Sequence, residues 1–344
     1  MSLLAPSASG ASPAMLNAQE LIQRLRENVR KAFLGSVSSV DQALCCLLAR
    51  GHVLIEDVPG VGKTVLATSL ARSVDCRFSR IQFTPDLLPS DVLGVSVLDR
   101  NSGEFELKPG PIFANIVLAD EINRTTPRTQ SALLEAMNEA SVSIDGKVLD
   151  LEQPFMVVAT QNPHEFEGAY PLPESQLDRF LMRISLGYPA REDEARILMQ
   201  RPGAPRTASA GPADASGGSP QIGALRRLQP VLNREDVLAL QSRVDQVRVD
   251  RALVEYIISF VTATRSHADL TIGVSPRGAL ALAAAARATA VLRGRDYCVP
   301  EDILSNIVPV CAHRVATRGR QYNGRADAAR RTIESIVEYL ESPA

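Results

Sequence analysis

The sequence contains no tryptophan, no excess of basic residues and no apolar run long enough to span a membrane. Lys and Arg together number 37 against 39 for Asp and Glu, which gives a formal net charge of -2. This balance argues against a dedicated nucleic-acid-coating protein, which carries a basic excess, and leaves room only for a local basic patch. The start of the chain lacks the charged residues and apolar core of a signal peptide. We therefore expect a cytoplasmic protein without membrane insertion.

Cysteine is also scarce. The five cysteines are odd in number and form no C-x-x-C pair. That pattern argues against a disulfide framework or a zinc site, and it is typical of reduced, mostly buried thiols in a cytosol. The four histidines are scattered without the carboxylate or cysteine spacing of a metal site; they are His52, His164, His267 and His313.

The chain is long enough for two domains, and changes of pattern along it indicate where they divide. Five short apolar runs alternate with helical patterns, which predicts an α/β core with a central parallel five-stranded sheet flanked by helices. These runs are residues 52–55, 77–83, 116–119, 155–160 and 182–186. From Asn233 onward the pattern is helical only. We expect a disordered N-terminus over 1–14, the core over 15–188, the start of the second domain with a flexible Gly/Ala/Pro/Ser-rich insertion over 189–229, and an all-α domain over 230–344.

A phosphate-binding loop follows the first apolar run. Gly60, Gly62, Lys63 and Thr64 stand between that run and a predicted helix, in the order of a P-loop. Glycines let backbone N–H groups turn towards phosphate, and the helix N-terminus adds partial positive charge. Lys63 is expected to reach the β- and γ-phosphates of ATP, and the Thr64 hydroxyl to bind Mg²⁺. Asp57 departs from the pattern, which has glycine there. The expected nucleotide-binding residues are Val58, Pro59, Gly60, Val61, Gly62, Lys63, Thr64 and Val65.

Acidic residues end the third apolar run, one helix-strand unit after the loop. Asp120 and Glu121 have the form of a Walker B segment, in which Asp120 lies beside the Mg²⁺ that Thr64 holds. Glu121 is then the candidate general base that polarises the attacking water. Asn162 ends the next run, where its amide is placed to orient the water or contact the γ-phosphate. In a parallel sheet the carboxyl ends of the strands meet at one edge, so these side chains are predicted to lie together.

Two β-hairpins interrupt the alternation of strands and helices. They are predicted at about 95–107 and at about 141–151, the second turning at Asp145-Gly146. Neither predicted tip carries an aromatic residue followed by an apolar one, the feature of a threading unfoldase. If the hairpins project from a ring face or pore, they are the parts on which nucleotide-driven motion would act; surface hairpins without function are an equally good interpretation.

Long motifs in this chain resemble those of the MoxR family of AAA+ ATPases. The resemblance covers about residues 17–200 and 230–315, and it includes residues 120–124, 130–137, 159–163, 171–174 and 177–180. It implies a P-loop AAA+ core with a C-terminal helical lid, in the clade that carries an insert in helix 2, to which the 95–107 hairpin corresponds. It also implies ATP and Mg²⁺ as cofactors, ATP hydrolysis, and a hexameric ring.

Two arginines complete the site that the resemblance implies. Arg277, after the helix-starting pair Ser275-Pro276, matches the sensor-2 arginine that brings the lid onto the γ-phosphate. A cation in the first turn of a helix is unfavourable for the helix dipole, so a phosphate partner explains it better than a structural role. Arg179 matches the arginine finger that reaches into a neighbouring subunit. Arg124, Arg128 and Arg183 stay open as competitors for that role.

The function that follows is ATP-driven, chaperone-like remodelling, assembly or activation of partner proteins or metalloenzyme complexes. The resemblance implies a protein partner, among them a von Willebrand factor A domain protein. A nucleic-acid motor of the helicase type is the alternative, and it predicts basic hairpin tips, whereas these hold a mixed set of charges: Asp99, Arg100, Glu104, Asp145 and Lys147. A third interpretation is a nucleotide-gated scaffold with little turnover, against which Glu121 and Arg179 argue.

Overall fold

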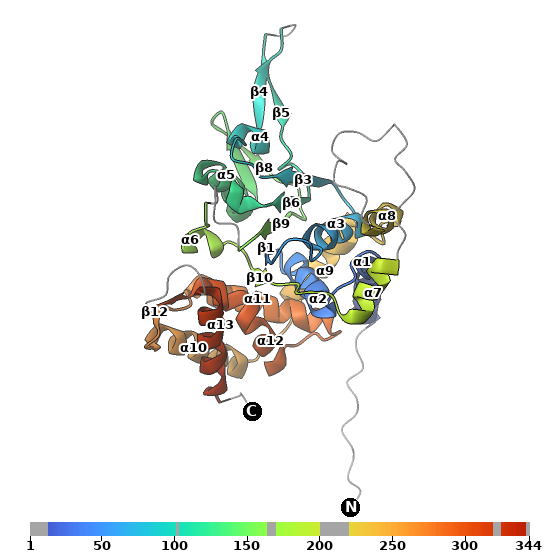
Figure 1. The fold of residues 1–344 in the computed structure, drawn as a ribbon. Helices are drawn as coiled ribbons and strands as arrows, with labels where there is room; N and C mark the ends of the chain where they lie inside the picture. The colour runs from blue at the N-terminus through green and yellow to red at the C-terminus, as the bar shows by residue number, and fades with distance from the viewer. Residues whose placement is uncertain (1–12, 101–102, 164–169, 200–219, 319–324, 342–344) are drawn as a thin grey trace, which may run out of the picture.

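Five parallel strands form the centre of the fold. The computed structural model describes residues 13–100, 103–163, 170–199, 220–318 and 325–341. The strands lie in the order β10-β1-β9-β6-β3 (Figure 1), with bounds β1 (Val53–Glu56), β3 (Phe78–Gln82), β6 (Ile116–Asp120), β9 (Met156–Gln161) and β10 (Met182–Ile184). The predicted five-stranded parallel sheet is confirmed. All five strands end at one side of the sheet, named here the carboxyl edge, and begin at the opposite side, named the amino edge.

Alternate residues of each strand pack on opposite faces of the sheet, because side chains in a strand alternate. One face packs with α1 (Pro13–Arg30), α2 (Val37–Leu48) and α3 (Lys63–Ser73). The other packs with α5 (Pro127–Glu139) and the hairpins. The first apolar cluster continues without a break into the C-terminal helices. Core and helical domain therefore share one apolar interior.

His52 connects neighbouring elements at the amino edge through hydrogen bonds. Its Nδ1 accepts a hydrogen bond from the Val157 N–H (3.0 Å), so the protonated Nε2 donates to the Met137 carbonyl (2.9 Å) at the end of α5. The His52 carbonyl accepts from the Leu181 N–H (2.8 Å) just before β10. Burial lowers the pKa of His52 to about 4, against the opposing effect of the Met137 bond, so the ring is neutral at pH 7. The end of α5 and the start of β10 are thus held together at this edge.

The two predicted hairpins are confirmed. The first, β4 (Gly94–Leu98) with β5 (Phe105–Pro109), follows the short helix α4 (Pro89–Leu93) and projects away from the sheet (Figure 1); the second pairs β7 (Ser141–Ile144) with β8 (Lys147–Asp150). Phe105 lies opposite Leu98 and is 72% exposed, and Leu98 is 50% exposed. An exposed apolar pair therefore forms near the tip across the two strands, between residues that are not adjacent in the sequence.

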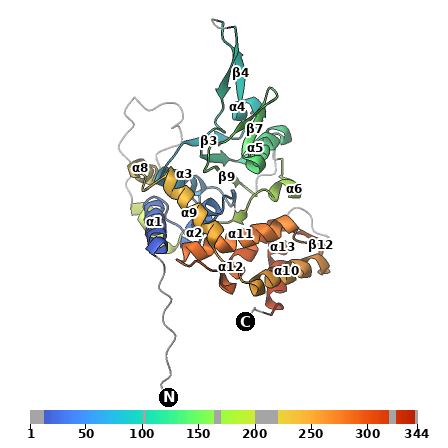
Figure 2. The same cartoon turned by 180° about the vertical axis from the view of Figure 1, so that it is seen from behind.

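Of the C-terminal helices, α12 packs against β10, α9 against α2 and α8 against α3. Figure 2 shows these helices from behind. Asn233, Asp250 and Ser275 cap their helices through side-chain hydrogen bonds to backbone N–H groups, as their positions predict. Before residues 200–219 the helices are α6 (Glu174–Leu177) and α7 (Arg191–Met199). After them come α8 (Pro220–Arg227), α9 (Arg234–Gln246), α10 (Arg251–Ser266), α11 (Pro276–Leu292), α12 (Pro300–Cys311) and α13 (Arg325–Glu338). Within the described ranges, no helix is both long and apolar enough to cross a membrane.

Two expectations about the fold need correction, and a third lies outside the described residues. The domain after residue 230 is not all-α, because β12 (Leu270–Ile272) pairs with β13 (Ala316–Thr317), and β11 (Leu232–Asn233) pairs with β2 (Val74–Asp75). These strands are two or three residues long, too short to show an alternation of apolar and polar residues in the sequence. The first helix begins at Pro13, two residues inside the segment expected to be disordered; residues 1–12 lie outside the described residues. Nearly all of the predicted flexible insertion, residues 200–219, lies outside them as well.

Candidate active site

The phosphate-binding loop has the backbone that its glycines permit. Gly60 (φ +87°) and Gly62 (φ +96°) adopt the left-handed conformation, and Gly62 is the N-cap of α3. A Cβ added at Gly60 would meet nothing within 4 Å, so the space beside the loop is open. Lys63 begins α3, and its ammonium donates to the carbonyls of Asp57 and Gln161 (3.2 Å to the latter). The lysine therefore lies between the ends of β1 and β9, at the carboxyl edge.

Asp120 is the centre of the polar cluster at this edge. It is buried, and its Oδ1 accepts a hydrogen bond from the Thr160 hydroxyl (2.5 Å). Its Oδ2 accepts from the Arg80 guanidinium (2.7 Å) and from the Thr64 hydroxyl (3.4 Å). The predicted pair of Thr64 and Asp120 is thus brought together in space.

Glu121 occupies a strained position beside Asp120. Its backbone is left-handed (φ 59°, ψ 47°), which a residue with a Cβ adopts at a cost, and such strain is concentrated at functional sites. The Thr160 hydroxyl accepts from the Glu121 N–H (2.9 Å). The Glu121 carboxylate accepts from the Gln82 amide (2.8 Å) and from Arg124 (3.1 Å). These bonds hold the carboxylate at the carboxyl edge.

Asn162 is buried directly after β9, next to Gln161, whose carbonyl binds Lys63. Its own carbonyl accepts a hydrogen bond from the Asn123 amide (3.4 Å), which connects the ends of β9 and β6. The predicted grouping of Lys63, Asp120, Glu121 and Asn162 at one sheet edge is therefore found.

The residues present fit a magnesium nucleotide. A hydroxyl and a carboxylate at one point are the hard oxygen ligands that Mg²⁺ prefers, and Thr64 with Asp120 provides both. The open glycine loop, the helix N-terminus and the Lys63 ammonium provide the positive potential that phosphates require.

Asp57 does not block this loop. Its Oδ1 accepts from the Val58 N–H (2.8 Å), and its Oδ2 accepts from the N–H groups of Leu186 and Gly187 (2.8 Å each) and from the Ser185 hydroxyl (2.7 Å). Burial would raise the pKa of Asp57, but the hydrogen bonds outweigh it and leave this pKa below its ordinary value. The carboxylate therefore fastens the phosphate loop to the segment after β10.

Replacing Asp57 with glycine, the residue that the general P-loop pattern has, is expected to harm the protein. Four hydrogen bonds to the carboxylate are lost, and we expect the free energy of unfolding to fall by about 1–2 kcal/mol and ATP affinity to weaken several-fold. Urea unfolding and titration with a fluorescent ATP analogue measure the two effects. Asp57→Asn, which keeps one acceptor oxygen, should lie between. Equal or better affinity in Asp57→Gly would show that the carboxylate has no part in holding the loop.

Arg179 lies at the amino edge, not with the other predicted residues. Its Nη1 donates to the Leu134 carbonyl (2.7 Å) of α5, and its buried Nε has no hydrogen-bond partner in the described part of the chain. It precedes β10, whereas the phosphate loop follows β1. Five residue steps from His52 to Asp57, at roughly 3.3 Å each, separate the two edges by about 16 Å. Arg179 therefore cannot reach its own phosphate loop.

Arg277 lies at the amino edge too. Its Nη2 donates to the Asn138 side chain (2.6 Å) at the end of α5, and its Nε is 3.9 Å from an oxygen of Asp178. None of the contacts that the structure gives for Arg277 involves Lys63, Thr64 or Asp120. The expectation that Arg277 brings the lid onto the phosphate of its own subunit is wrong for this structure, because the lid packs at the β10 side of the sheet.

The competing arginines occupy other positions. Arg124 binds Glu121 at the carboxyl edge, and Arg128 is exposed in the first turn of α5, near the same edge. Arg183 is paired with Glu56 (3.3 Å) between β10 and β1. Among these arginines, Arg179 is the one placed opposite the phosphate loop.

Sequence reasoning missed Arg80, Gln82 and Thr160. Arg80 and Gln82 reach Asp120 and Glu121 because β3 lies beside β6, with Gln82 in register with Asp120. Thr160 reaches both acids from β9. These contacts depend on the order and register of the strands, which no local sequence pattern shows.

The family model for ATPases associated with various cellular activities (AAA) matches residues 52–182, and that for the AAA lid domain matches residues 262–337. Over 86% of this chain and 75% of its own length, Chaperone MoxR1 of Mycobacterium tuberculosis is 42% identical. The chain belongs to the MoxR family of AAA+ ATPases. The uncharacterized protein YeaC of Bacillus subtilis is 46% identical over 92% of this chain and 94% of its own.

A solved structure extends the match to nearly the whole chain. A crystal structure of a protein from Cytophaga hutchinsonii, provisionally described as an ATPase, superposes with a TM-score of 0.80 at 35% identity, covering 96% of this chain and 97% of that one. The AAA+ core and the lid domain are both within this overlap. Nucleotide binding is thus supported for this chain by its family.

Proposed function

We propose that this MoxR protein hydrolyses ATP in a ring of identical subunits and uses the resulting motion to remodel a partner protein. The observation that carries the proposal is the position of Arg179 and Arg277 at the amino edge, at the opposite ends of the strands from their own phosphate loop. Two guanidiniums on the far side of the sheet are of use in hydrolysis only at the site of a second copy. The ring is proposed to be a hexamer, as the family resemblance implies.

Within one subunit, the carboxyl edge binds the nucleotide. The glycine loop and Lys63 bind the phosphates. Thr64 with Asp120 would hold Mg²⁺, which would supply positive charge next to the phosphates. Asn162 orients the attacking water. Glu121 takes a proton from that water as its oxygen bonds to the γ-phosphorus and the bond to the bridging oxygen of ADP breaks. Arg179 and Arg277 of the neighbour stabilise the charge on the transferring group.

The partner is proposed to be a protein. A relative carries the name chaperone, and the exposed pair of Phe105 and Leu98 on the projecting hairpin suits an apolar protein surface better than a phosphate backbone. A von Willebrand factor A domain protein remains the partner class that the family resemblance implies. The free cysteines of the described chain suit the cytoplasm as the proposed compartment.

ATP turnover measured against protein concentration tests the shared site. We expect the rate per subunit to rise steeply with concentration and to level off as rings assemble, because each site is incomplete without a neighbour. Light scattering in parallel should show the mass rising over the same range. A rate per subunit that stays flat while the mass changes would contradict the shared site and favour a monomeric nucleotide switch. A ring that binds ATP with negligible turnover at every concentration would favour the scaffold interpretation.

A further inference from the structure

The segment that carries Arg179 is bound by two adjacent lid residues. Arg314, in η3 (Ala312–Arg314), donates from Nη2 to the carbonyls of Asp178 (3.1 Å) and Phe180 (2.7 Å). Its Nη1 donates to the Leu181 carbonyl (3.1 Å), and its Nε to Asp178 Oδ1 (2.7 Å). The ring of His313 lies with Nε2 at 3.0 Å from the same Phe180 carbonyl. The backbone on both sides of Arg179 is therefore held from the lid.

The Arg314 guanidinium is buried, and all of its N–H donors are hydrogen-bonded. Its fifth donor position binds the Val310 carbonyl, and the residue is 8% exposed. A buried cation is costly unless every donor is paired, and the planar fork of arginine provides five donors in fixed directions. Here four of the five bonds go to the segment between α6 and β10. The arrangement fixes the backbone of that segment in one place, which an ordinary surface ion pair does not do.

Asp178 connects Arg314 with Arg277. One of its oxygens binds Arg314 at 2.7 Å, and the other lies 3.9 Å from the Arg277 Nε. Arg277 is exposed and Arg314 is buried, so Asp178 stands between a buried cation and an exposed one. Both arginines of the amino edge are thus connected to Arg314, one through the backbone and one through a carboxylate.

We propose that Arg314 is a positioning residue that locks Arg179 and Arg277 to the lid as one unit. When the lid moves, both guanidiniums move with it relative to the site of the neighbouring subunit, so the lid of one subunit sets the activity of the next. The inference rests on the proposed function, since it needs a shared site. An error of about 1 Å in the placement of such a group costs roughly a hundredfold in rate.

The test is Arg314→Lys, which keeps the charge but cannot make five directed bonds. We expect kcat to fall roughly 10- to 100-fold, with the Kd for a fluorescent ATP analogue within about threefold of wild type, because the subunit's own phosphate loop is at the other edge. Mixing with Glu121→Gln subunits should restore activity, since these cannot hydrolyse ATP but present intact arginines to a neighbour. A role in stability alone would not produce rescue in mixed rings.

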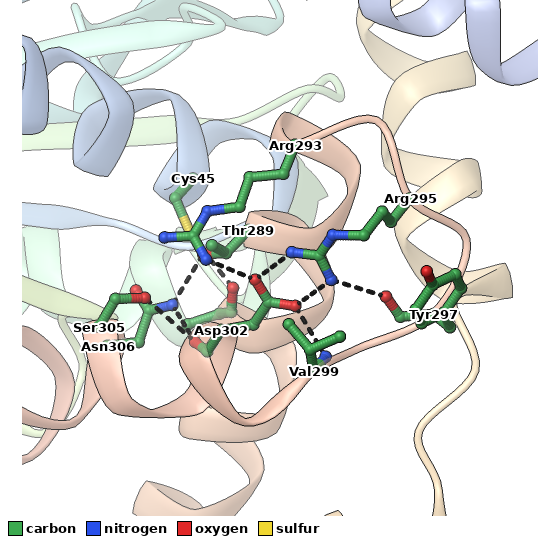
Figure 3. Close-up of polar contacts among 10 residues, drawn as sticks. Cys45, Thr289, Arg293, Arg295, Tyr297, Val299, Asp302, Ser305 and Asn306 are labelled. Atoms are coloured by element: carbon green, nitrogen blue, oxygen red, sulfur yellow. Dashed lines mark hydrogen bonds and ion pairs between the residues drawn. The ribbon is translucent and has the colours of Figure 1, made fainter. Parts of the chain in front are cut away.

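Arg295→Lys is the matched control. Arg295 binds the fully buried Asp302 at 2.7 Å through both of its terminal nitrogens, and Arg293 binds the same carboxylate at 3.0 Å (Figure 3). This is also a buried lid ion pair, but none of its described contacts involves the Arg179 segment. Arg295→Lys should therefore lower the melting temperature without changing kcat at a temperature where the protein is folded.

The outcomes separate the inference from the proposed function. Wild-type kcat in Arg314→Lys, with Arg179→Ala inactive, overturns the inference and leaves the shared site intact. Failure of Glu121→Gln subunits to rescue Arg179→Ala overturns the shared site itself. Loss of ATP binding and of rescue together in a folded Arg314→Lys protein would assign a structural role only. If Arg314→Lys does not fold, Asp178→Asn decides in its place, because it removes the charge that faces both arginines and keeps the shape; wild-type kcat there overturns the inference.

Discussion

Arg179→Ala is expected to lower kcat for ATP hydrolysis by roughly 10³- to 10⁵-fold while leaving the Kd for ATP unchanged. The guanidinium lies at the amino edge, at the opposite ends of the strands from the phosphate loop of its own subunit, so we expect it to contribute nothing to binding there. In the neighbour's site it would meet the charge that develops on the transferring group. Its Nε is buried and without a hydrogen-bond partner in the described structure, and it would gain one at that site. Steady-state turnover and a separate binding titration measure the two quantities.

Mixing experiments make this result specific. Arg179→Ala and Glu121→Gln subunits are each expected to be inactive alone. Mixed in equal amounts, they should recover activity at roughly a quarter of the interfaces, where an intact Glu121 faces an intact Arg179. Arg128→Ala serves as the comparison, since Arg128 is exposed at the opposite edge and is expected to change kcat little. An inactive Arg128→Ala beside an active Arg179→Ala would assign the finger to Arg128.

What could be predicted from the sequence are features that depend on neighbours along the chain. The strand, glycine loop and helix around Lys63 are contiguous, and so are the strand and acids at Asp120 and Glu121. The helix starts at Asn233, Asp250 and Ser275 follow from side-chain capping within three residues. Their grouping at one edge then follows from the rule that parallel strands present their carboxyl ends together.

What could not be predicted depends on how separate elements meet. The Arg80 to Asp120 contact needs β3 beside β6 in a particular register. The position of Arg277 was predicted incorrectly because the sequence shows that a lid helix begins there but not which side of the sheet the lid covers. Asp57 looked like a defect in a pattern, and only the proximity of residues 185–187 shows that it has its own partners. Local rules contain no information on any of these.

The strained backbone of Glu121 is relevant to the second substitution with a large expected effect, Glu121→Gln. The residue before the short helix η1 (Ile122–Arg124) is left-handed, which directs the carboxylate along the carboxyl edge towards Gln82 and Arg124. A general base must be held within reach of the water it activates, and a cost in backbone energy is accepted at such sites. Gln has the same length and the same backbone preferences as Glu, so Glu121→Gln tests the charge of the side chain without changing its place.

Glu121→Gln is expected to lower kcat by roughly 10²- to 10⁴-fold and to leave ATP affinity within about threefold of wild type. The amide cannot take the proton of the attacking water, whereas Lys63, Thr64 and Asp120, the proposed ligands of the phosphates and the metal ion, are unchanged. Single-turnover hydrolysis and retention of labelled ATP on the isolated ring measure the two effects. Gln82→Ala is the informative companion, because it removes a hydrogen bond to the carboxylate but not the base, and a change in kcat below about tenfold is expected. Near wild-type turnover in Glu121→Gln would mean that another group accepts the proton, and the bonds from Gln82 and Arg124 would then have a structural role only.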